Sequence, residues 1–89
     1  VDAKAPPVLM IAPPGLGKLS VLAELFAGGT EKSRQLATHY RSFATQLGCH
    51  FLDAAEIVES SPIDGVHWAA DQHARFGRAV ADAVVAILA

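Results

Sequence analysis

Several features are scarce in this 89-residue chain, and each scarcity excludes a class of protein. A single cysteine, Cys49, excludes a fold held by internal disulfides. Only seven Lys and Arg, with a net charge of −2, leave no basic surface for nucleic acid. The apolar runs are far shorter than the roughly 18–20 residues of a membrane span. Charged residues make up only 18% of the chain, against about a quarter in a soluble protein.

What the chain does contain is apolar sequence, at 52% of its residues. This excludes intrinsic disorder, which requires low hydrophobicity and high net charge. A chain this short buries only about 60–65% of the surface that it exposes when unfolded. The composition therefore resembles the interior of a larger protein, and we expect the apolar faces to have partners elsewhere.

Two short apolar runs predict strands. Residues 8–12 (Val-Leu-Met-Ile-Ala) lie between proline pairs and suit a strand that is buried on both faces, as in a parallel sheet. Residues 49–52 predict a second strand. The segment 15–29 between them has glycines at both ends, and we expect a connection there with a short amphipathic helix.

Two longer segments predict helices. In residues 30–47, Thr30 is the expected N-cap and Gly48 the expected C-terminal stop. Residues 70–88 carry an apolar face, with Gly77 as a weak point. A strand–helix–strand order of this length implies parallel strands. The prediction is an α/β fold: the C-terminal part of a three-layer α/β/α doubly wound domain (flavodoxin-like), because two strands cannot form an independent sheet.

The sequence Asp64-Gly65-Val66-His67 is the strongest chemical motif. Acyl transfer by a serine needs a histidine base and a carboxylate that holds the histidine's tautomer. An aspartate three residues before a histidine can present both groups to one point. The alternative is an aspartate that caps a turn beside a surface histidine, and the four letters leave both readings open.

The surrounding residues resemble the C-terminal block of SGNH (GDSL-type) hydrolases. The segment 60–68 (Ser-Ser-Pro-Ile-Asp-Gly-Val-His-Trp) is followed by an Ala-rich helix with His73 and Gly77. Residues 8–14 look like the family's fourth core strand and its exit, and residues 51–54 look like its last strand. The similarity covers nearly the whole chain and is closest to the bacterial arylesterase and acyltransferase branch.

This resemblance implies that residues 1–89 are the C-terminal segment of one hydrolase domain, acting on a small ester without a cofactor. His67 would be the base and Asp64 its partner. The family's Gly-Asp-Ser block and its oxyanion asparagine have no counterpart here, since the chain contains no asparagine. A companion segment, absent from this chain, would supply the serine and the oxyanion hole. The candidate substrate-binding residues are Trp68, Val66 and Pro14.

Two other ligand sites are disfavoured. The segment 12–19 (Ala-Pro-Pro-Gly-Leu-Gly-Lys-Leu) follows a strand as a phosphate-binding loop does, but it lacks the first glycine and the final Ser or Thr of that motif. A loop at the carboxyl end of a strand can still border a substrate pocket, which is the reason for including Pro14. The four histidines show no metal-ligand spacing, so no metal is expected.

A second function class stays open. The chain could be a non-catalytic α/β interaction module whose apolar faces bind another protein. In either case the apolar segment 15–26 suits subunit contact, and we expect a homo-oligomer. No nucleic-acid or membrane partner is expected. The compartment stays open, because any targeting signal would lie upstream, and the bacterial cytoplasm is the expectation.

Overall fold

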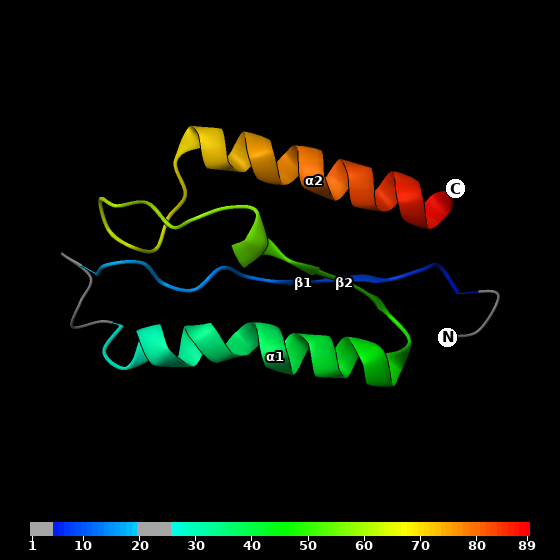
Figure 1. Cartoon of the computed structure of the whole chain (residues 1–89), viewed down its shortest axis with the longest axis horizontal. Coiled ribbons are helices and arrows are strands. Elements are labelled where there is room, and N and C mark those ends of the chain that lie inside the picture. Colours follow the sequence, from blue (N-terminus) through cyan, green and yellow to red (C-terminus); the bar gives the residue numbers. More distant parts are fainter. Residues whose placement is uncertain (1–4, 20–25) are drawn as a thin grey trace.

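A computed structural model describes residues 5–19 and 26–89. The elements follow in the order β1 (Leu9–Ala12), α1 (Gly29–Leu47), β2 (His50–Asp53), a short 3-10 helix η1 (Ala54–Glu56) and α2 (Ala70–Leu88). In Figure 1, α1 and α2 lie on opposite sides of the two strands. This arrangement is a piece of an α/β/α domain, as the sequence predicted.

The two strands pair in parallel, with Leu9 opposite His50 and Ala12 opposite Asp53. The predicted parallel crossover is therefore confirmed, with the second strand one residue further along than expected. Parallel pairing brings both carboxyl ends to the same edge of the sheet. The loops that leave β1 and β2 consequently start side by side, and the candidate site is built from them.

Helix α1 begins earlier than predicted, and its expected cap is wrong. The N-cap is Gly28, whose φ of 77° is left-handed, and no side chain caps this end of the helix. Thr30 instead lies inside the first turn. The predicted stop is confirmed: Gly48 has a φ of 69°, and the next amide, of Cys49, donates to the carbonyl of Ala44 at 2.8 Å.

Helix α2 has the predicted extent and continues through Gly77. The 3-10 helix η1 was not predicted. It starts because the Asp53 carboxylate at the end of β2 accepts a hydrogen bond from the amide of Ala55 at 3.0 Å. The helix expected within residues 15–29 falls largely on 20–25, outside the described residues. On either side of that gap, residues 15–19 are irregular and 26–28 form a turn.

The described core is small. Its buried apolar residues are Ala12, Ala44, Ala54 and Val58, and no large side chain in the described ranges is fully buried. Several large apolar side chains of α1 and α2 are exposed instead, among them Phe43, Leu47, Val85 and Leu88. Thus only some of the apolar side chains in the described part of the chain are buried. No helix in that part is long and apolar enough to cross a membrane.

Candidate active site

The candidate site is a loop between η1 and α2 that folds back against the loop after β1. Residues 57–69 connect η1 to α2, and within them Gly65 accepts a hydrogen bond from the amide of Gly17, in the loop after β1. In open α/β sheets, ligands bind in the crevice outside the carboxyl ends of the strands. The Asp64–His67 motif therefore lies at the edge where a site is expected.

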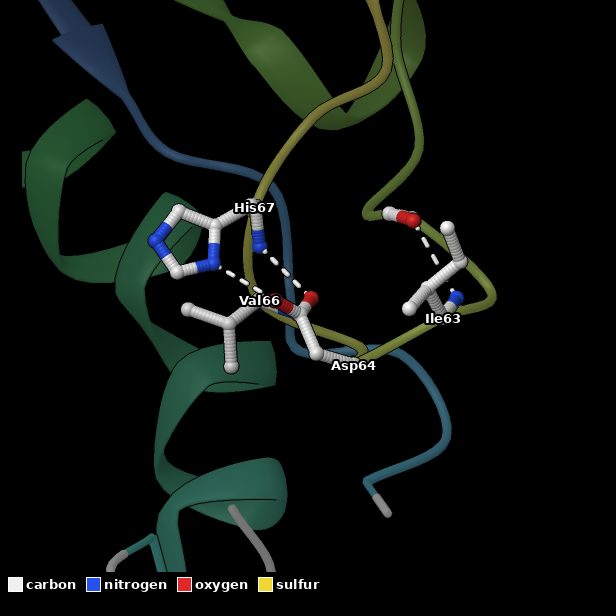
Figure 2. A network of polar contacts seen from close by, with 5 residues as sticks. Ile63, Asp64, Val66 and His67 are labelled. Carbon is white, nitrogen blue, oxygen red and sulfur yellow. Dashed lines mark hydrogen bonds and ion pairs between the residues drawn. The ribbon is translucent and has the colours of Figure 1, made fainter. Parts of the chain in front are cut away.

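The structure joins Asp64 and His67 directly. The Nδ1 atom of His67 lies 2.6 Å from Oδ2 of Asp64 (Figure 2). The other carboxylate oxygen, Oδ1, accepts the backbone amides of Val66 at 2.8 Å and His67 at 2.9 Å. The carboxylate both shapes the turn and holds the imidazole. These contacts are compatible with both readings that the sequence left open, an aspartate that caps a turn beside a surface histidine and an aspartate that orients a histidine base.

These hydrogen bonds favour the charged carboxylate. They lower the pKa of Asp64 from 3.8 to about 2: the Val66 amide has the largest effect, followed by the His67 side chain and the His67 amide. The Asp64 side chain is only 17% exposed, whereas that of His67 is 77% exposed. Asp64 is thus an ionised, enclosed partner for a histidine that faces outward.

The orientation of the imidazole leaves one nitrogen available. Nδ1 faces Asp64, and Nε2 points away from it (Figure 2). A hydrogen bond from Nδ1 to a carboxylate fixes the tautomer in which Nε2 accepts a proton. The pair is therefore arranged as a base and its orienting acid.

The loop around the pair is closed by its own backbone. The amide of Ser61 donates to the carbonyl of His67 at 2.6 Å, and the amide of Gly65 donates to the carbonyl of Ser61 at 2.7 Å. Gly65 has a φ of 74°, a left-handed conformation that favours glycine. A Cβ at this position would lie 2.5 Å from the carbonyl oxygen of Lys18. Glycine is therefore required at this position for two independent reasons.

Trp68 follows His67 in the chain and contacts two side chains of α2. Its ring packs against His73 with centroids 5.2 Å apart, and edge-to-face against Phe76 at 5.0 Å. His67, Trp68 and His73 line an open cavity of about 340 Å³. The sequence placed His73 on the helix after the motif and gave it no role in the site. Its place one turn into α2, six residues after His67, is the signal that could have grouped it with the site.

The other two substrate-binding candidates lie apart from this cavity. Val66 is half-buried between Asp64 and His67 in the chain, and its amide supports the carboxylate. Pro14 lines a different cavity, of about 410 Å³, together with Gly17, Lys18 and residues 60–62. The structure thus groups Trp68 with His67 and places Pro14 on a neighbouring hollow.

Two amides of the glycine-containing loop after β1 are already bonded within the chain and so are not available to a phosphate. The amide of Leu16 donates to Ser33 Oγ at 2.9 Å, and the amide of Gly17 donates to the Gly65 carbonyl at 2.8 Å. Nor do the described residues contain a group of three or more His, Cys, Asp or Glu that could hold a metal ion.

Comparison with solved structures gives consistent matches, whereas no protein-family model and no curated protein matches the chain. A carbohydrate acetylesterase from Sinorhizobium meliloti is 36% identical, with a TM-score of 0.89 over 93% of this chain and 40% of that one. The native aryl esterase of M. smegmatis is 30% identical, with a TM-score of 0.86 over 92% and 39%. A putative arylesterase from Agrobacterium tumefaciens is 38% identical, with a TM-score of 0.78 over the same shares. The chain thus spans about two fifths of the length of each of these proteins.

Proposed function

Because this chain belongs to the SGNH esterase family, we propose that it supplies the aspartate and the histidine of a Ser-His-Asp triad that hydrolyses carboxylic esters. One observation carries the proposal: the 2.6 Å contact between His67 Nδ1 and an Asp64 carboxylate that two backbone amides already hold in place. A histidine so oriented has the geometry that a serine nucleophile needs in its base.

In the proposed reaction, His67 Nε2 takes the proton of the serine hydroxyl as the serine oxygen attacks the ester carbonyl. The tetrahedral intermediate then collapses, and His67 returns that proton to the departing alcohol. Water, activated in the same way, cleaves the acyl-enzyme and releases the acid. Another alcohol in place of water would give acyl transfer. Asp64 stays ionised throughout and stabilises the imidazolium.

The serine is proposed to come from a segment outside these 89 residues. None of the five serines follows Gly-Asp, and there is no asparagine for an oxyanion hole. The large apolar side chains left exposed on α1 and α2 would be covered by that companion segment. A homo-oligomer would use the same kind of surface.

The proposed substrate is a small ester whose alcohol or acyl part lies against Trp68. Two of the similar structures are named as a carbohydrate acetylesterase and an aryl esterase. The flat ring of an aryl ester can stack on an aromatic side chain. His67, whose Nε2 would protonate such a leaving group, lines an open cavity together with Trp68 and His73.

The test is a His67→Ala variant of the enzyme that includes its serine segment, assayed with a p-nitrophenyl ester. We expect kcat to fall by about 10³-fold or more, as in other serine triads. The matched control is His39→Ala, since His39 is an exposed histidine on α1, away from the loop. Equal activity of the two variants would refute the proposal.

A fluorophosphonate probe distinguishes this function from the alternative, a non-catalytic interaction module. The probe reacts with an activated serine and should label the serine-bearing segment in the unmodified enzyme. Labelling should decrease in the His67→Ala variant, because the serine then lacks its base. Well-folded protein that is never labelled would favour the interaction module.

A further inference from the structure

We propose that Ser33, near the N-terminus of α1, is a positioning residue for the Asp64–His67 pair and acts through the loop after β1. This inference rests on the proposed esterase function. Ser33 lies on an element that carries no residue of the proposed triad. Its hydroxyl is nonetheless the first member of a series of hydrogen bonds that ends at Gly65, between Asp64 and His67.

The loop that carries the pair behaves as one unit, because its hydrogen bonds close within it. Ser61 binds His67 and Gly65 through its backbone, and its Oγ accepts the amide of Ile63 at 3.1 Å. Asp64 in turn binds the amides that follow it. The internal geometry of the unit is thus set locally, whereas its position relative to the sheet depends on contacts with other segments.

The loop after β1 makes two of those contacts. The Gly17 amide donates to the Gly65 carbonyl at 2.8 Å, and Ser60 Oγ donates to the Gly15 carbonyl at 3.0 Å. Gly17 also approaches so closely that a Cβ there would lie 3.4 Å from the Gly65 Cα. Segment 15–17 is therefore the support on which the catalytic turn is placed.

Segment 15–17 has no regular secondary structure, and α1 holds it through Ser33. Ser33 Oγ accepts the Leu16 amide at 2.9 Å and donates its own hydrogen to the Thr30 carbonyl at 2.8 Å. The second bond fixes the hydroxyl so that its lone pair faces Leu16. Helix α1 packs against both strands, so it offers a rigid reference for the loop and, through it, for His67.

Loss of the Ser33 hydroxyl should therefore shift the position of an intact Asp64–His67 pair relative to the serine. A misplacement of 1 Å can cost about 10²-fold in rate. Because the hydrogen bond from Ser60 to Gly15 remains in the variant, we expect a smaller loss than that. We expect Ser33→Ala to lower kcat about tenfold with little change in KM, because the residue touches no part of the substrate cavities. Alanine is the better helix former, so α1 itself should not be weakened.

The experiment measures kcat, KM and Tm in the serine-containing enzyme for Ser33→Ala, Ser33→Thr and Ser42→Ala. Ser42 is an exposed serine on the same helix and controls for the change of residue type. Ser33→Thr keeps the hydroxyl and should retain most of kcat, and Ser42→Ala should match the unmodified enzyme. The inference fails if Ser33→Ala keeps the kcat of Ser42→Ala, or if Ser33→Thr loses as much as Ser33→Ala.

Two variants of Gly17 provide a second test if Ser33→Ala does not fold. Gly17→Ala keeps the amide donor and places its Cβ at 3.4 Å or more from its neighbours, whereas Gly17→Pro removes that donor. The proline variant should lose clearly more kcat than the alanine variant, and equal kcat in the two would overturn the inference. The His67→Ala variant separates the two proposals. Activity without His67 refutes the esterase function itself, whereas an inactive His67→Ala beside an unaffected Ser33→Ala refutes only the positioning role.

Discussion

Replacing Gly65 with alanine should impair catalysis without removing any functional group. Gly65 sits between Asp64 and Val66 in the chain, and its φ of 74° is a conformation in which other L-residues are strained by roughly 1–2 kcal/mol. The new Cβ would also lie 2.5 Å from the Lys18 carbonyl oxygen, where ordinary contacts begin at 3.4 Å. Backbone atoms cannot rotate away as a flexible side chain can, so the two segments must separate.

The distance that the catalytic turn must move away from Lys18 sets the expected loss of kcat. Going from 2.5 Å to 3.4 Å means that the catalytic turn moves away from Lys18 by about 0.9 Å. His67 is two residues away in the same closed loop and should move with the turn. A displacement of about 1 Å at a catalytic group costs about 10²-fold. Steric overlap of this kind adds roughly 1–3 kcal/mol of destabilisation to the strain from φ.

The assay compares Gly65→Ala with Gly77→Ala in the serine-containing enzyme. Gly77 lies in the exposed part of α2, and a Cβ there meets nothing within 4 Å. Its replacement should stabilise the protein by about 0.5–1 kcal/mol and leave kcat unchanged. We expect Gly65→Ala to lower both Tm and kcat. If both variants have kcat values within a factor of two of each other, the close approach to Lys18 does not position His67.

Three further predictions concern the site itself. Asp64→Asn should lower kcat by about 10³–10⁴-fold, since the amide no longer holds the required tautomer of His67; steady-state kinetics measures this. Because the folded-state pKa of Asp64 is lowered from 3.8 to about 2, the carboxylate stabilises the fold above about pH 4 and loses this effect as the pH falls toward 2. The Tm difference between the unmodified enzyme and Asp64→Asn should therefore shrink over that range, and a difference independent of pH would contradict it. Trp68→Ala removes the ring contacts with His73 and Phe76 and should raise KM for an aryl ester several-fold more than for an alkyl ester, as initial-rate measurements would show.

The sequence predicted the ends of helices and strands well where a single residue determines the local backbone conformation. Gly48 ends α1 because a left-handed C-terminal residue favours glycine. The start of α1 was predicted less well. Thr30 has a good capping side chain, but the N-cap is Gly28, so the chain enters the helix two residues earlier. The 3-10 helix η1 was missed because it depends on a single contact from Asp53 to Ala55.

In the site, too, the sequence predicted the local contacts and missed the contacts between distant segments. The Asp64–His67 spacing was readable because all of its hydrogen bonds lie within four consecutive residues. His73 was not assigned to the cavity beside His67, and the sequence did not show that Pro14 lines a separate cavity. Both depend on how α2 and the loop after β1 lie around the turn, which no local pattern encodes.

The sequence alone determined the shortage of charge and the excess of apolar residues in this short chain. It also determined most of the strand and helix segments and the spacing of the paired aspartate and histidine. Tertiary structure decided where that pair sits. The amide of Gly17 meets the carbonyl of Gly65 across 48 residues of chain only because the two strands are parallel and their ends share one edge. Contacts between distant segments depend on the packing of whole elements, whereas a turn of four residues is fixed by its own hydrogen bonds.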